Sequence, residues 1–391
     1  MSAFFADLGY QAVQAGFPLF LVVTLHQPVW EYGLASAISY GGGAVFSYVG
    51  ARLGDRIGHR RLALAGNSAI PLLSFCALMS NPVWAIGMLT GGWWARNLRS
   101  PSRRVMLVEA VPDEKRRADA FGFLHALDVG GGALAAGYLL LAVDHHVAFR
   151  WIFVATAFPL LLSTLSLSRA TVGRAASGER PATEPARREP ESGGPPGAVR
   201  LLAAAALYGF TFYSAGFPVL TLAQSSGHLT EGVGAFLVLQ VTSAATGYLL
   251  GGHLGRSPSA QLLRLGLLGY GGAGLGAALL AASYGEHLPS AAAFVSVALI
   301  GLALGVVETL EPAAMSLLRS GRMTGRGMGA LSAARSAGTF SANLAMGLLY
   351  AVSASLAYGY AAILAAAAGA VVLGALPGLR RWQTRSDQAV P

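Results

Sequence analysis

Long runs of apolar residues follow one another along the chain, and short polar breaks separate them. An α-helix needs roughly 20 apolar residues to cross the hydrocarbon core of a bilayer, and the runs are close to that length. They predict an all-α membrane protein with twelve spanning helices. The expected helices cover residues 2–25, 31–53, 62–79, 82–109, 118–141, 147–168, 199–223, 230–252, 261–283, 288–317, 325–352 and 355–378.

One polar stretch divides these helices into two sets of six. It contains the segment GERPATEPARREPESGGPPG, whose Pro, Gly, Glu and Arg residues offer almost nothing to bury. We therefore expect a linker between two helical bundles and a short polar tail at the end. The predicted boundaries are 1–168 for the N-terminal bundle, 169–198 for the linker, 199–378 for the C-terminal bundle and 379–391 for the tail.

A short segment occurs near the start of each set of helices. Ala-Gly-Phe-Pro stands at 15–18 and again at 215–218, an offset of 200 residues. The same offset relates Glu31 to Glu231, Tyr48 to Tyr248 and Arg56 to Arg256. Two copies of one unit explain this register, as in transporters built from internal repeats. We predict two pseudo-symmetric bundles, whose first helices are bent alike by a proline around a shared central cavity.

The composition supports a membrane protein. Only 12% of the residues are charged and 54% are hydrophobic, whereas ordinary soluble domains contain about 25% charged residues. The formal net charge of +9 does not indicate nucleic-acid binding, because the arginines lie in short loops between the apolar runs. Since such loops mark the cytoplasmic side of a membrane, we expect both termini, the linker and the tail in the cytoplasm.

The polar loop after the second predicted helix reads GARLGDRIGHRR at 50–61. It resembles the loop motif G-x-x-x-D-[RK]-x-G-[RK]-[RK] of the major facilitator superfamily, although Ala51 and His59 depart from that pattern. The resemblance implies two six-helix bundles and a latch on the cytoplasmic side, in which an acid meets the positive end of a facing helix dipole. The residues expected to form this latch are Asp55, Arg56, Gly58 and Arg60.

The fourth and fifth predicted helices narrow the resemblance. The sequence RNLRSPSRRVMLVEAVPDEKRRADAFGFLHALDVGGG is similar to a poorly characterised bacterial branch of the superfamily, in whose fifth helix an arginine stands where this chain has His125. Members of the branch look like exporters of drugs or metal chelates. The resemblance therefore implies a multi-pass protein of the bacterial cytoplasmic membrane, acting as a monomer.

Several ionisable residues lie inside the predicted helices, where a charge is expensive and is a functional candidate. Pseudo-symmetry relates the halves and suggests two ion pairs, Arg96 with Asp128 and Glu308 with Arg335. Purely structural salt bridges remain an alternative for both pairs. Because His125 and Asp128 share a helix face, a proton could pass between them, but two ligands are too few to predict a metal site. The candidates for proton coupling are Asp128, His125, Glu308 and Asp7.

Polar faces on spanning helices must turn towards a cavity or a neighbouring helix. The first and seventh predicted helices carry such stripes, and the charges described above add to them. The candidates for the substrate cavity are Tyr10, Gln11, Gln14, Arg96, Asn97, Tyr208, Thr211, Glu308, Glu311 and Arg335.

These features predict a secondary transporter that moves a small molecule by alternating access, with protons and the lipid bilayer as its other partners. Export of a drug-like compound or metal chelate is the expected direction. An importer or facilitator of an organic anion is an alternative, and a non-transporting receptor or assembly factor is another. The chain contains no G-x-x-x-x-G-K-[ST], H-E-x-x-H or G-x-S-x-G motif, so we expect neither an enzyme nor a bound cofactor.

Overall fold

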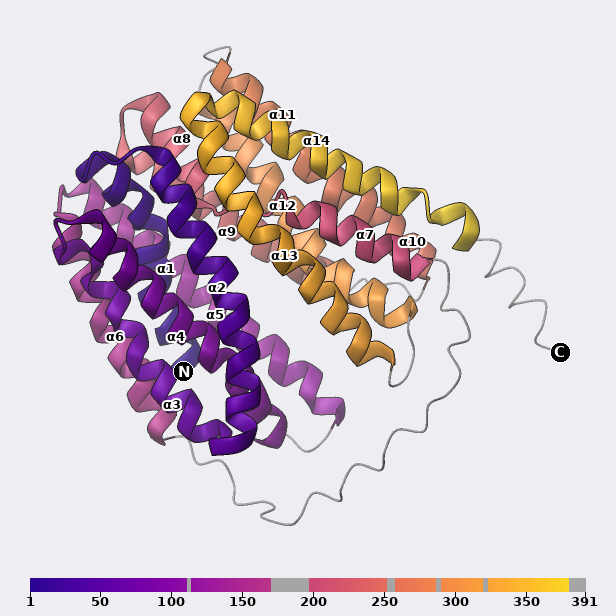
Figure 1. Ribbon diagram of the computed structural model, residues 1–391, viewed down its shortest axis with the longest axis horizontal. Helices are drawn as coiled ribbons and strands as arrows, with labels where there is room; N and C mark the ends of the chain where they lie inside the picture. The colour runs from indigo at the N-terminus through magenta and orange to yellow at the C-terminus, as the bar shows by residue number, and fades with distance from the viewer. Residues whose placement is uncertain (111–113, 170–196, 252–256, 286–289, 319–322, 380–391) are drawn as a thin grey trace.

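The computed structural model describes residues 1–110, 114–169, 197–251, 257–285, 290–318 and 323–379, and these residues form helices and turns without a strand (Figure 1). The first six crossing segments are α1 with η1 (Ser2–Leu19 and Phe20–Thr24), α2 (Val29–Ile57), α3 with η2 (His59–Ala69 and Ile70–Leu78), α4 (Pro82–Ala110), α5 (Glu114–Asp144) and α6 (Phe149–Arg169). The second six are α7 with α8 (Gly197–Gly209 and Gly216–Ser226), α9 (Leu229–Gly251), α10 with η3 and α11 (Pro258–Arg264, Leu265–Gly271 and Gly272–Gly285), α12 (Ser290–Leu318), α13 (Met323–Val352) and α14 (Ala354–Leu373).

Seven of the helical stretches in the described residues are long and apolar enough to cross a membrane. They are His59–Leu78, Leu127–Asp144, Phe149–Arg169, Leu229–Leu250, Pro258–Tyr284, Ser290–Met315 and Ala354–Leu379. Other segments are of similar length but more polar; α4, for example, contains Arg96, Arg99 and Arg103. The chain is therefore a multi-pass membrane protein.

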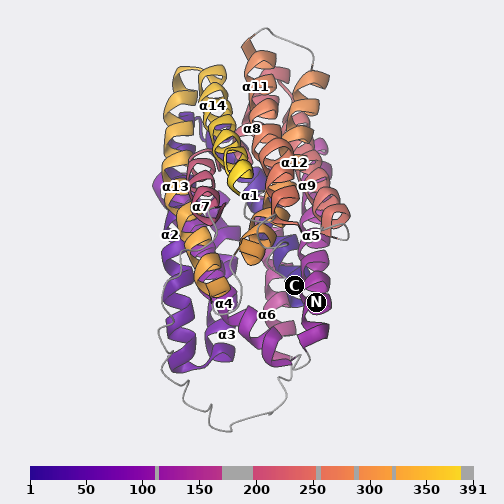
Figure 2. The same ribbon diagram turned by 90° about the vertical axis from the view of Figure 1, so that its right-hand side faces the viewer.

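The segments form two bundles that follow the chain order. In the first bundle, called the N half, α1 packs on α5 and α6, and α2 packs on α4. In the second, called the C half, α9 packs on α12, and α11 packs on α12 and α14. The two main seams between the halves are α2 against α13 and α5 against α9, which Figure 2 shows on opposite sides of the molecule. In addition, α1 packs on α8.

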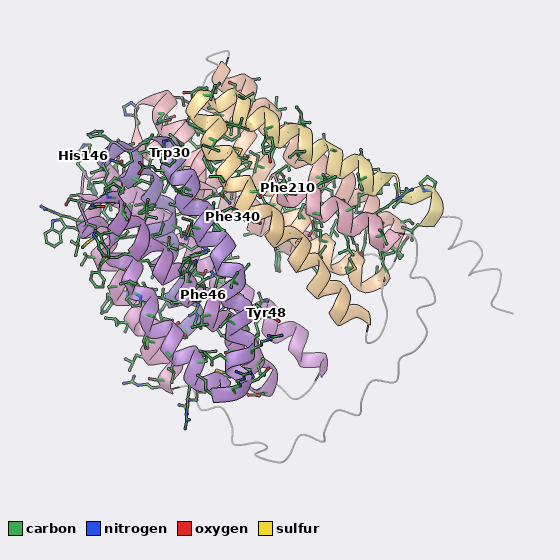
Figure 3. The ribbon with its side chains drawn as sticks, viewed as in Figure 1. Trp30, Phe46, Tyr48, His146, Phe210 and Phe340 are labelled. Atoms are coloured by element: carbon green, nitrogen blue, oxygen red, sulfur yellow. The ribbon has the colours of Figure 1, made fainter. Side chains whose placement is uncertain are left out.

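The halves meet at one end of the molecule, called here the closed end, and separate towards the other (Figure 1). At the separated end α6 finishes and α7 begins, so it is called the linker end. Figure 3 shows Trp30 near the closed end, and Phe46 and Tyr48 further along α2 towards the linker end. Tyr48 is 58% exposed, which agrees with the separation of the halves on that side.

Two glycines allow the close approach at the closed end. A Cβ atom on Gly33 of α2 would lie 2.5 Å from the Cα atom of Gly347 on α13, too close for any side chain. Further along the same seam, a Cβ atom on Gly41 would lie 2.7 Å from the ring of Phe340. The seam between α2 and α13 thus depends on small residues, as helix contacts in lipid commonly do.

The two Ala-Gly-Phe-Pro copies do not have the same structure, so the expectation of identical bends is wrong. Pro18 lies within the last turns of α1, which continues into the wider π-helical turn η1. Pro218 lies in the first turn of α8, where no intrahelical partner is lost by its missing N–H. The predicted helix at 199–223 is interrupted just before this proline, at residues 210–215.

Candidate functional site

A cavity of about 530 Å³ lies between the two halves. Its size falls in the range of roughly 300–1,000 Å³ that is usual for small-molecule sites. The N half lines it with Gln11, Gln14, Tyr40, Trp93 and Arg96. The C half lines it with Tyr208, residues 211–216, Phe236, Leu239, Gln240, Ser243, Ala273, Ala277, Ile300, Leu304, Glu308, Ala361 and Ala365.

Six of the expected cavity residues are therefore in the lining: Gln11, Gln14, Arg96, Tyr208, Thr211 and Glu308. Tyr10, Asn97, Glu311 and Arg335 are not among the lining residues. Asn97 faces α2 instead, because its Nδ2 lies against Gly43 of that helix. The same Nδ2 donates to the carbonyl oxygen of Trp93, one turn earlier on α4. The lining residues Gln240 and Ser243 could have been suspected from sequence, since they are polar and one turn apart within a predicted spanning helix.

Arg96 is the charged group on the N-half wall. Its guanidinium lies over the rings of Tyr10 and Trp93, 5.1 Å and 4.8 Å from their centroids. One terminal nitrogen donates to the Tyr10 hydroxyl at 3.3 Å. The Arg96 Nε and the Gln14 Nε2 are buried donors with no hydrogen-bond partner among the described residues. This wall thus holds unused hydrogen-bonding capacity, which is uncommon in folded proteins.

Asp7 lies behind this wall and is only 3% exposed. Its Oδ1 accepts a hydrogen bond from the Tyr10 hydroxyl, while its Oδ2 has no partner in the described part of the chain. Tyr10 therefore donates to Asp7 and accepts from Arg96 at the same time. The Tyr10 hydroxyl therefore connects Asp7 to Arg96, two side chains that do not pair directly with each other.

At the C-half wall the lining residue Glu308 belongs to a group in which one arginine lies between two acids. Arg335 Nη1 lies 2.5 Å from Glu308 Oε1, and its Nη2 pairs with Glu311 Oε2. Glu311 is fully buried and also accepts a hydrogen bond of 2.5 Å from the Tyr270 hydroxyl. Glu308 is 53% exposed and lines the cavity. The expected pair of Glu308 with Arg335 is confirmed, and Glu311 is its third member.

The expected pair of Arg96 with Asp128 is wrong. Asp128 instead pairs with Arg103, whose Nη2 lies 3.0 Å from its Oδ2. Arg103 is seven residues after Arg96 on α4, which is about 10 Å further towards the linker end. Which arginine of α4 pairs with Asp128 depends on how far α5 is shifted along α4. The spacing of residues in the sequence does not determine that shift. The side chain of His125, the other candidate on α5, lies outside the described residues.

The described hydrogen bonds and ion pairs of the loop motif lie within the N half. His59 lies 3.3 Å from Asp55 and 3.2 Å from the Ser102 hydroxyl, and Arg60 donates to the Ser168 carbonyl oxygen at 2.8 Å. Gly58 has a φ of 95° between α2 and α3, which is why a glycine suits this turn. Neither Asp55 nor Arg56 makes a hydrogen bond or ion pair with the described part of the C half in this state, whose linker end is open, so the latch stays a prediction.

One polar contact joins the two halves and could not be predicted from the sequence. At the closed end the Tyr32 hydroxyl of α2 lies 2.7 Å from the Ser214 hydroxyl. The backbone N–H of Ser214 in turn donates to Asn343 Oδ1 of α13 at 2.8 Å. Tyr32 is 3% exposed and Asn343 is fully buried. We call these three residues the closed-end lock.

No group of three or more His, Cys, Asp or Glu side chains that could hold a metal ion occurs in the described residues.

Residues 1–342 match the family model described as Major Facilitator Superfamily. The chain belongs to the Major Facilitator Superfamily. As a member, it is a secondary transporter and not an enzyme.

Solved structures of Major Facilitator Superfamily transporters share the fold of the chain. A D-xylose-proton symporter is 13% identical, with a TM-score of 0.74 over 97% of this chain and 97% of that one. A peptide transporter POT in complex with sulfate is 14% identical, with a TM-score of 0.72 over 97% and 94%. A bacterial homologue of the human lysosomal transporter Spinster, inward-facing and occupied, is 15% identical, with a TM-score of 0.67 over 97% and 94%. No curated protein matches the chain in sequence. At these identities the likeness concerns the fold alone.

Proposed function

We propose that the chain exports a small organic molecule or metal chelate in exchange for protons, acting as a monomer by alternating access. The linker end, with Arg56, Arg60 and Arg169, faces the cytoplasm of a bacterial inner membrane in this proposal, because such arginine-rich loops stay inside. The cavity in its present state is then accessible from the cytoplasm.

The observation that carries the proposal is the excess negative charge in the group of Glu308, Arg335 and Glu311. Two carboxylates share one guanidinium, so one negative charge is left over when both acids are ionised. Either a proton on Glu308 or a cationic group of a substrate can neutralise it. The two neutralising charges exclude each other at this site, and mutual exclusion is the requirement for exchange transport.

Glu308 is favoured over the other proton-coupling candidates by its position. It lines the cavity, whereas Asp7 is enclosed behind Tyr10, and Asp128 is bound to Arg103. When Glu308 is protonated, Arg335 keeps Glu311 as its counter-ion, so no charge is stranded. We therefore assign proton exchange to Glu308 and a supporting, charge-balancing role to Asp7 and Asp128.

The test uses inside-out membrane vesicles whose lumen is acidified by respiration and reported by a pH-sensitive acridine dye. A panel of organic cations, zwitterions and metal chelates is added to the vesicles. At least one compound should release luminal protons, and Glu308→Gln vesicles should show no release. The proposal would be refuted if no compound of the panel released luminal protons, or if proton release were the same in Glu308→Gln vesicles.

Uptake of an organic anion is the second candidate, because Arg96 lines the cavity with an unpartnered Nε. Right-side-out vesicles distinguish the two directions. Accumulation of a labelled anion in them, driven by an inward proton gradient, would favour uptake. Accumulation of a labelled compound in inside-out vesicles would favour export.

A further inference from the structure

Two opposite charges line the cavity, one from each half. Arg96 on the N-half wall and Glu308 on the C-half wall are the charged side chains among the described lining residues. They belong to different halves, so a ligand that binds both must span the seam between the halves. A molecule with a single charge satisfies only one of these walls.

The N-half wall is suited to an anionic group. Arg99 is 1% exposed, and its described partner is the neutral Asn67, so the buried set of Asp7, Arg96 and Arg99 carries one excess positive charge. The unpartnered donors of Arg96 and Gln14 belong to side chains that line the cavity. A carboxylate or another anionic oxygen group would balance this charge and accept hydrogen bonds from both side chains after a small rotation.

The C-half wall is suited to a cationic group. Glu308 supplies the excess negative charge described above and is 53% exposed. Tyr208 and Phe212 line the cavity close to the Glu308–Arg335 pair, with the guanidinium 5.5 Å from the Phe212 ring centroid. Aromatic faces attract cations, so these rings add to the attraction of the carboxylate for an ammonium group.

Between the two charged walls the lining is apolar. Trp93, Phe236, Ala277 and Leu304 face this space. Such a surface favours an apolar or aromatic body between the charged groups of a ligand, because its burial removes apolar surface from water.

We propose that the cavity takes a small zwitterion, with its anionic group at Arg96 and Gln14, its cationic group at Glu308, and an apolar body between them. The inference rests on the transport function proposed above and names the substrate class of the same site. A zwitterion would draw the N half and the C half together through its two ends, and a singly charged compound would not.

The test is a matched ligand series on the purified full-length protein in detergent. Phenylalanine and the dipeptide alanyl-phenylalanine are compared with their N-acetyl, C-amide and doubly blocked derivatives by isothermal titration calorimetry. Each free zwitterion should bind about tenfold or more tightly than either singly blocked form, since each blocked end loses a charge-assisted hydrogen bond. Equal affinities for a zwitterion and a blocked form, or no binding of both zwitterions at millimolar concentration, would overturn the inference.

Two variants assign the ends. In Arg96→Gln the zwitterion and its C-amide should bind equally, because the carboxylate has lost its partner. In Glu308→Gln the zwitterion and its N-acetyl form should bind equally. Arg150→Gln and Asp144→Asn change exposed charges near the closed end and should keep the full pattern of the parent. The proposed orientation is contradicted if the two cavity variants show each other's affinity pattern, or if they keep the pattern of the parent. If a variant fails to fold, the ligand series on the parent protein still tests the substrate class.

The outcomes separate this inference from the proposed function. Zwitterion binding with the expected pattern, but without proton release in vesicles, would refute the proposed proton exchange and keep the site. Proton release by singly charged compounds, together with absent zwitterion binding, would keep proton exchange and refute the substrate class.

Discussion

Removing one hydroxyl from the closed-end lock should shift the protein towards the state that is open at that end. The Tyr32 hydroxyl makes the 2.7 Å contact with Ser214 across the two halves. Tyr32→Phe deletes this contact and keeps the ring, which packs edge-on against Phe217 with centroids 5.2 Å apart. The variant therefore tests the hydrogen bond without creating a cavity.

The expected magnitude follows from the burial of this contact. A buried neutral hydrogen bond contributes about 1 kcal/mol net, and the contact exists only while the closed end is closed. Its loss should change the equilibrium between the two states by about fivefold, because 1.4 kcal/mol corresponds to tenfold. Ser214 keeps its backbone hydrogen bond to Asn343 in both proteins, so the rest of the lock remains.

The assay is the distance between spin labels on exposed closed-end positions, Val147 of the N half and Val352 of the C half, by double electron–electron resonance. The longer-distance population should grow about fivefold relative to the shorter one in Tyr32→Phe. Tyr350→Phe is the matched control, since Tyr350 is also buried but its hydroxyl bonds Thr221 and Gln224 within the C half. Identical distributions in Tyr32→Phe and the parent, or an equal shift in the control, would refute the reasoning.

Three further predictions concern the charged residues. Asp55→Asn should weaken the latch and reduce the population in which the two halves are together at the linker end. Distances between spin labels on the two halves at that end should lengthen, and unchanged distances would contradict the prediction. Asp7→Asn should lower the melting temperature more than Asp128→Asn does, because Asp7 is 3% exposed and Asp128 is 28% exposed; the reverse order would contradict this. Arg335→Met should destabilise the protein by about 3–5 kcal/mol, since Glu311 would be buried without its counter-ion, and a chemical unfolding curve close to that of the parent would disprove it.

The sequence predicts the helices well because the signal is local. A spanning helix needs a certain number of apolar residues, and that number can be read within one run. The described helices begin and end within a few residues of most predicted ranges, as for α4 at Pro82–Ala110 against 82–109. The interruption at residues 210–215 escaped the same reasoning, because these residues carry no charge and continue the uncharged run on either side.

The site was less predictable because it depends on contacts between distant segments. Pseudo-symmetry identified the pair of Glu308 and Arg335, but it misplaced the partner of Asp128 by two helical turns. The closed-end lock joins Tyr32 to Ser214, which are 182 positions apart and follow no shared period. Such contacts depend on how helices rotate and slide against one another, and hydrophobic runs do not record either motion.

The interruption between α7 and α8 also constrains what can surround it. Residues 211–216 line the cavity, and the helix that would satisfy their peptide groups is broken there. Some of these groups find other partners, such as the Thr211 N–H with the Tyr208 carbonyl oxygen and the Ser214 N–H with Asn343 Oδ1, both at 2.8 Å. Hydrocarbon cannot satisfy the remainder. Lipid tails must therefore be kept from this stretch throughout the working cycle, and the space beside it has to be occupied by water, by cargo or by the opposing half at every moment.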